Sequence, residues 1–204
     1  MIGAVGAMVD TGAVTVVATR VSTATSPTLL LAVLYPVVGA LAAGPPGIAW
    51  SLLGMVFTVV IPAAIVDVGV RRGRYTDHHL SRREQRAVPL GLAALSVLVG
   101  LGVLWLAGAP RAIVALQVAV LATTVVATTV TLWWKVSFHV AVVSAAACVL
   151  TLLGGGWWAL AWLAVPLVGW ARLRLTAHTL AQVIVGGLLG AGVSGLVLII
   201  AGVA

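Results

Sequence analysis

Charged side chains are scarce in this chain of 204 residues. Asp, Glu, Lys and Arg together make up 7% of it, and only four residues are acidic. So small a charged fraction cannot cover the surface of a soluble domain of this length, whereas the 62% hydrophobic fraction is typical of a chain embedded in lipid. The composition therefore predicts an all-α integral membrane bundle without a separate soluble domain.

Three further features are missing. Cys148 is the single cysteine, so an intrachain disulfide is excluded. The net charge of +7 is not gathered in a Lys/Arg-rich tail, which argues against a nucleic-acid partner and favours phosphorylated lipids and membrane lipids. No basic segment precedes the apolar N-terminus, so we expect residues 1–26 to form an N-terminal interfacial segment rather than a cleaved signal peptide.

Long apolar stretches are abundant. A helix needs about 20 apolar residues to cross a bilayer. By that rule we expect six or seven spans, at 27–43, 47–70, 87–109, 113–133, 139–153, 157–170 and 179–203. The number is six if the fifth and sixth form one interrupted span, but Gly154-Gly155-Gly156 favours a turn between two short helices. Residues 27–204 are thus predicted to form a polytopic bundle with about six core transmembrane helices.

Breaker residues pair these spans into hairpins. Tight turns are predicted at Gly44-Pro45-Pro46-Gly47, at Gly108-Ala109-Pro110-Arg111 and at the glycine triplet. Three polar islands, 71–86, 135–139 and 172–182, join successive hairpins and hold nine of the eleven Lys and Arg residues and all four His. Because each hairpin returns the chain to the side it left, the islands should share one membrane face. The positive-inside rule places that face in the cytoplasm of a multi-pass cell-membrane protein.

The second island carries Lys135, Ser137 and His139 at alternate positions, where the chain enters a helix. A phosphoryl group needs positive charge, a hydroxyl or amide donor and a proton source for its leaving oxygen, and these residues supply one of each. A helix N-terminus also favours an anion. The alternative is a topology-setting Lys, a Ser cap and an interfacial His.

The third island offers Arg172, which can bind phosphate oxygens in a bidentate manner. His178 and Gln182 are four residues apart at the start of the last helix, so they share a face, and Gln182 could hydrogen-bond one imidazole nitrogen. The alternative is an interfacial arginine pair, Arg172 and Arg174, with a structural histidine.

These two islands together resemble the type-2 phosphatidic acid phosphatase superfamily, which includes the vanadium haloperoxidases. The family's second motif is Pro-Ser-Gly-His, and this chain has Val136-Ser137-Phe138-His139. The third motif is Ser-Arg, then a His six residues on and an Asp four further on. This chain has Ala171-Arg172, His178 and Gln182 at the same spacings. The resemblance covers roughly residue 74 to the C-terminus.

The resemblance implies a metal-independent phosphatase without a cofactor. His178 would be the nucleophile that forms a phosphohistidine, and His139 would be the general acid. Arg172 and Ser137 would bind the phosphate oxygens, and Lys135 of the second island would add its positive charge. The family's first motif, a Lys followed seven residues later by Arg-Pro, is lacking. Its nearest candidates are Arg86, Arg82, Arg83 and Arg74.

Two departures from the family pattern bear on the chemistry. Gln182 replaces the Asp that charges and orients the nucleophile, and a neutral amide cannot stabilise imidazolium with a full charge. Phe138 replaces a Gly that lets the backbone approach phosphate.

Asp77 is a candidate orienting acid that could also pair with Arg74. Asp77 with His78 and His79 is a poor metal site, because adjacent histidines rarely reach one ion, so no metal is expected.

The leading hypothesis is thus a membrane phosphatase acting on an isoprenoid (di)phosphate or a phosphatidate-type lipid. The alternatives are a prenyl-diphosphate-using enzyme on the same fold and a non-catalytic phospholipid-binding membrane subunit.

Overall fold

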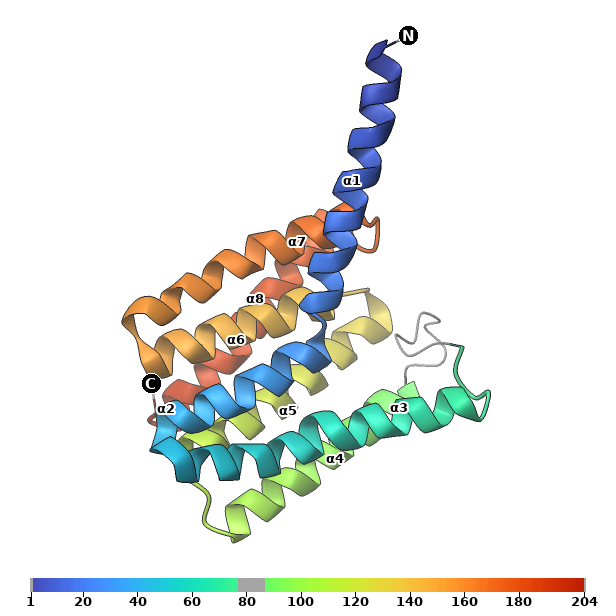
Figure 1. Cartoon of the computed structure of the whole chain (residues 1–204). Coiled ribbons are helices and arrows are strands. Elements are labelled where there is room, and N and C mark those ends of the chain that lie inside the picture. Colours follow the sequence, from blue (N-terminus) through green and yellow to red (C-terminus); the bar gives the residue numbers. More distant parts are fainter. Residues whose placement is uncertain (1, 77–86, 204) are drawn as a thin grey trace.

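The computed structural model describes residues 2–76 and 87–203, and every regular element in these ranges is helical (Figure 1). The all-α prediction is confirmed for them. In chain order the elements are α1 (Ile2–Ala24), α2 (Pro27–Met55), the π-helical segment η1 (Val56–Val60), α3 (Ile61–Arg71), α4 (Ala87–Leu106), α5 (Arg111–Trp133), α6 (Phe138–Gly154), the 3₁₀ segment η3 (Gly156–Leu163), α7 (Ala164–Arg174) and α8 (Leu180–Ile200).

Four helical stretches of the described chain are long and apolar enough to cross a membrane. They are Pro27–Arg71, Val88–Leu106, Arg111–Trp133 and Leu180–Ile200, and Phe138–Gly154 is a shorter apolar helix. By length and composition these helices are compatible with a membrane protein.

The 45-residue stretch Pro27–Arg71 is folded back on itself at Ala43 and Gly44. Gly44 has φ 58° and ψ −142°, a backbone conformation open to glycine but strained for other residues. Past this point the chain reverses and runs back beside the first arm (Figure 1). A Cβ on Gly39 would overlap the carbonyl group of Gly47, so the two arms touch through their backbones. The predicted hairpin at residues 44–47 is confirmed.

The other two predicted hairpins are also present. α4 and α5 are joined by residues 107–110, and the helix α6 ends at Gly154, where Gly155 with φ 59° reverses the chain into η3. The Trp162 indole donates to Thr151 Oγ1 at 3.1 Å, which ties the returning segment to α6. The expected plain helix over 157–170 was wrong in detail, because its first part is 3₁₀ rather than α-helical.

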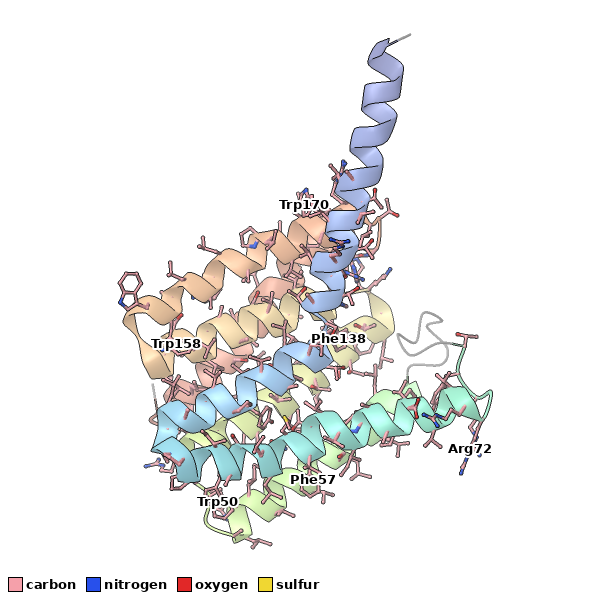
Figure 2. All side chains as sticks on the ribbon, viewed as in Figure 1. Trp50, Phe57, Arg72, Phe138, Trp158 and Trp170 are labelled. Atoms are coloured by element: carbon pink, nitrogen blue, oxygen red, sulfur yellow. The ribbon has the colours of Figure 1, made fainter. Side chains whose placement is uncertain are left out.

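The hairpin turns gather at one end of the bundle, and the described parts of the three islands, 71–76, 135–139 and 172–182, lie at the other (Figure 1). At the turn end, Arg111 Nη2 donates to the Ala201 carbonyl oxygen at 3.0 Å, which places the start of α5 beside the end of α8. Exposed tryptophans occur near both ends: Trp105 and Trp157 near the turns, Trp133 beside the second island. Figure 2 shows Trp158 and Trp170 at opposite ends. Such a pair of aromatic belts is expected of a bundle that spans a bilayer.

The helices α6 and α8 form the centre of the bundle and lie unusually close together. A Cβ on Gly186 would come within 2.7 Å of the Ser137 carbonyl oxygen, and one on Gly190 would overlap the Ala141 carbonyl. Small residues spaced four apart permit this backbone contact. Around this pair, Tyr35, Leu116, Val149 and Leu198 pack into a buried core shared with α2 and α5.

A buried polar network crosses the apolar interior. The Tyr35 hydroxyl donates to Gln117 Oε1 at 2.5 Å and lies 2.8 Å from Thr58 Oγ1, and Gln117 Nε2 donates to the Val97 carbonyl at 3.1 Å. Thr58 lies in η1, where the π-helical register shifts the usual backbone bonds. Ser96 Oγ donates to the Phe57 carbonyl in the same segment, at 2.7 Å. The network therefore connects α2, η1, α4 and α5.

The helix α1 packs against α7 and extends beyond the bundle at the island end (Figure 1). It is one continuous helix, and its interfacial location remains a prediction.

Candidate phosphate site at the island end

The second and third islands meet in the folded chain. Lys135 Nζ donates to the Ala177 carbonyl oxygen at 2.6 Å, and the Ser137 amide donates to the Gln182 carbonyl at 3.3 Å. These contacts join the α5–α6 linker to the α7–α8 loop, across more than forty residues of sequence. The prediction that these two stretches meet is confirmed.

The same contacts bring two helix N-termini together. Ser137 is the N-cap residue of α6, and Thr179 is the N-cap residue of α8. Each N-terminus carries unpaired amide groups and about half a positive charge from the helix dipole. With the exposed ammonium of Lys135 beside them, they make this junction electropositive. A phosphate group is the kind of anion that such a junction attracts.

Ser137 does not act as an ordinary cap. Its side chain makes no capping hydrogen bond to α6, and Ser137 is fully buried. Within the described structure its hydroxyl has no hydrogen-bond partner. Buried hydroxyls are normally paired, so this one needs an explanation other than helix capping. Ser137 thus occupies the N-cap position of α6 without capping the helix through its side chain.

Arg172 is half-buried in the last turn of α7 and reaches α1. Its Nη1 donates to Ser22 Oγ at 2.7 Å, while its Nε is buried and lacks a hydrogen-bond partner in the described part of the chain. Burial lowers the pKa of the Arg172 guanidinium, because desolvation disfavours the charged form. A guanidinium still remains protonated near neutral pH, so a partner anion would offset its desolvation.

The two candidate histidines flank this junction. His139 lies in the first turn of α6, and His178 directly precedes the N-cap of α8. Both residues are partly buried, and Nδ1 of His178 is a buried atom, which leaves Nε2 as the nitrogen for a ligand from outside the bundle.

The loop between α7 and α8 contains local backbone strain. Thr176 has φ 50°, in the left-handed region that β-branched residues avoid. Its neighbour Ala177 donates its amide to the Arg172 carbonyl at 3.1 Å and accepts from Lys135. The strained turn thus places Ala177 against Lys135 and sets His178 at the junction. Strain of this kind is concentrated at functional sites.

The Gln182 side chain has a partner that the sequence did not indicate. Its Oε1 accepts from the Thr179 amide at 3.1 Å, and Thr179 Oγ1 accepts from the Gln182 amide at 3.4 Å. This reciprocal pair is a capping box at the start of α8. The Gln182 amide oxygen is thus engaged in the helix cap, and the predicted contact of Gln182 with the His178 imidazole stays a prediction.

The first island is only partly described. Asp77, His78, His79, Arg82, Arg83 and Arg86 lie outside the described residues, so their predicted roles stay predictions. Arg74 is described and lies with Arg72 and Tyr75 at a groove between α3 and α4. Arg71 pairs with Asp67, with 2.8 Å between Nε and Oδ2.

Sequence reasoning missed Ser22, Thr176 and the Ala177 carbonyl. Ser22 lies 150 residues from Arg172, and no local pattern indicates their contact. One weak signal in the sequence indicated the strained residue Thr176. The polar run after Arg174 contains no glycine, which is the usual residue at the C-terminal end of a helix.

No protein-family model, curated protein or solved structure matches this chain, so the likeness to the type-2 phosphatidic acid phosphatase superfamily rests on its own residues.

Proposed function

We propose that this chain is an integral membrane lipid phosphate phosphatase whose site lies at the junction of the α5–α6 linker and the α7–α8 loop. The observation that carries the proposal is the contact of the two motif-bearing stretches through Lys135 and Ala177 and through Ser137 and Gln182. Residues that no local pattern could bring together meet at two helix N-termini, where a phosphate is favoured. The substrate is an isoprenoid (di)phosphate or a phosphatidate-type lipid.

In the proposed reaction the His178 imidazole attacks phosphorus, and the bond from phosphorus to the leaving oxygen breaks. His139 donates its proton to that oxygen, which departs as an alcohol or a phosphate. Water then attacks the phosphohistidine, the bond from nitrogen to phosphorus breaks, and the water proton returns to His139. Lys135, Ser137 and Arg172 hold the phosphoryl oxygens, as donors aimed at developing negative charge.

Two donors of the described site support this role. The Ser137 hydroxyl and Arg172 Nε are both buried without a hydrogen-bond partner among the described residues. Phosphoryl oxygens are strong acceptors that would satisfy both. The first-motif arginines Arg82, Arg83 and Arg86 would add charge to the same group, with Asp77 orienting one of them.

We place the junction at the cytoplasmic face of the cell membrane. Nine of the eleven Lys and Arg residues belong to the islands, whereas Arg111 contacts the opposite end of α8. In this topology the shorter arms, including Phe138–Gly154, also cross the bilayer, which gives six or seven spans.

The test is phosphate release by the purified full chain in detergent, with phosphatidate and farnesyl diphosphate as substrates and with a chelator present. We expect release without magnesium, inhibition by vanadate, and loss of at least a hundred-fold in rate for His178→Ala, since the nucleophile is removed. Arg172→Gln should be impaired, whereas Arg174→Gln, an exposed neighbour on the same helix, should not be. Full activity of His178→Ala would overturn the assignment of the nucleophile.

A non-catalytic phospholipid-binding subunit is the second candidate, because the Gln182 oxygen is engaged in the helix cap and no carboxylate replaces it there. A phosphorylated lipid that copurifies intact, with no turnover of either substrate, would favour it. A product with an altered carbon skeleton would instead indicate a prenyl-diphosphate-using enzyme.

A further inference from the structure

A second basic feature lies on α3 and α4, apart from the junction described above. A groove of about 390 Å³ runs between these helices, within the range of about 300–1,000 Å³ that small-molecule sites occupy. Its walls are apolar, with Ile61, Ile65 and Val68 from α3 and Leu92 from α4. At its polar end are Arg72, Arg74 and Tyr75.

The polar end is built by the way α3 stops. Gly73 has φ 67°, and the amides of Arg74 and Tyr75 both donate to the Gly69 carbonyl, at 2.9 and 3.3 Å. This turn folds Tyr75 back onto α3, where its ring covers Gly69 so closely that a Cβ there would overlap it. Arg72 and Arg74 consequently lie at the rim, and Figure 2 shows Arg72 at the outer end of α3.

The charges at the rim are of one sign. Arg72 and Arg74 are exposed, and no acidic side chain of the described chain lines the groove. Asp67 pairs with Arg71, which does not line it. Two exposed guanidinium groups at this rim favour a ligand with an anionic head.

The groove also has the length of one membrane leaflet. Ile61, Ile65 and Val68 form a stripe along one face of α3 that leads to its C-cap residue Arg72, and the eleven steps from Ile61 to Arg72 rise about 16 Å. Half of the roughly 30 Å hydrocarbon thickness is about 15 Å. The small side chain of the exposed Ala64 leaves space in the groove wall beside this stripe. An acyl chain that starts at the head-group level would thus end near Ile61.

We infer that this groove binds an anionic diacyl phospholipid, with its phosphate at Arg72 and Arg74 and one acyl chain along α3. The site is separate from the phosphatase junction and does not depend on catalysis. Basic pockets between transmembrane helices bind anionic head groups. Each basic residue near the membrane surface strengthens this binding roughly five-fold. The bound lipid would fill the space between α3 and α4 and hold these peripheral helices together.

The experiment is a titration of the full chain, in neutral detergent, with dioleoyl phosphatidylglycerol or dioleoyl phosphatidylcholine, with bound lipid counted by native mass spectrometry. We expect tighter binding of phosphatidylglycerol by about ten-fold or more. The double variant Arg72→Gln/Arg74→Gln should lose most of this preference, since both charges are removed. Arg71→Gln is the matched control, because Arg71 is adjacent but pairs with Asp67 outside the groove, and it should retain the preference.

A bulky substitution in the groove wall tests the position of the acyl chain. Ala64→Phe fills the groove wall and should weaken binding of both lipids several-fold, whereas Ala63→Phe, on the same exposed helix but outside the groove, should not. Thermal unfolding of the lipid-free variants checks that each one is folded. Equal binding of the two lipids by the unmodified chain, or unchanged binding by Ala64→Phe, would overturn the inference. Phosphatase activity enters neither measurement, so the two proposals fail independently.

Discussion

The Gln182 side chain caps the start of α8 and lies four residues after His178, the proposed nucleophile. The amide oxygen accepts from Thr179, and it supplies no negative charge to His178. A carboxylate at this position would remain compatible with the start of α8, because acidic groups are favoured in the first helical turn. The same carboxylate would stabilise an imidazolium four residues earlier, where a neutral amide cannot.

We therefore expect Gln182→Asp to raise the phosphate-release rate about ten-fold, the effect of roughly 1.4 kcal/mol of added stabilisation. The measurement is the steady-state rate with phosphatidate in detergent. Gln182→Glu is the control, because it introduces the same charge yet preserves the capping box, whose third residue is commonly Glu. A slower Gln182→Asp enzyme with unchanged thermal stability would show that the site does not use a charged partner for His178.

Among the elements, α6 and α8 depend most on residues without side chains. Gly190→Ala should destabilise the protein by at least about 2 kcal/mol, because the new Cβ would overlap the Ala141 carbonyl and force the helices apart. The measurement is thermal unfolding in detergent. Gly192→Ala, two residues along the same helix, has no atom within 4 Å of the new Cβ and should be neutral or slightly stabilising. Equal losses in both variants would contradict the close contact.

The boundaries of the elements were largely predictable because they depend on local chemistry. Gly44 and the glycine triplet marked turns, and the last helix began where the polar run ended. The π-helical segment at Val56–Val60 had no such signal, since its apolar sequence suits an ordinary helix. It depends on Thr58 and Phe57 meeting groups on other helices, which only the packed bundle determines.

The residues of the candidate site also fall into those that the sequence predicted and those that it did not. Motif spacing predicted that the stretches around Ser137 and Gln182 meet, and the Ser137 amide does donate to the Gln182 carbonyl. The strained Thr176 and the contact between Ser22 and Arg172 carry no pattern of this kind. Such partners are determined by where α1 and α7 pack, and sequence gives the faces of helices more readily than their neighbours.

On the scale of the whole molecule, the two proposed lipid sites lie on different helix pairs joined by the buried network. Gln117 on α5 accepts from Tyr35 on α2 and donates to the Val97 carbonyl on α4, so it connects the central helices to the peripheral hairpin. Gly54 and Gly100 leave room for it, since a Cβ on either would come within 3.2 Å or less of its amide group. The network therefore holds the α3–α4 pair in register with the rest of the bundle.

Gln117→Leu tests this role. The substitution removes one acceptor and one donor from a fully buried site, and buried groups that lose their partners cost about 1–3 kcal/mol each. Two effects reduce the loss: Tyr35 and Thr58 remain 2.8 Å apart and can pair with each other, and interhelical bonds in membranes average only about 0.6 kcal/mol. We expect a net destabilisation of about 1–2 kcal/mol in detergent.

In a double-mutant cycle, Tyr35→Phe and Gln117→Leu should couple by more than about 0.5 kcal/mol, since they share one hydrogen bond. Strict additivity would mean that Tyr35 and Gln117 contribute separately, and that the register of α3 and α4 is set by apolar packing alone.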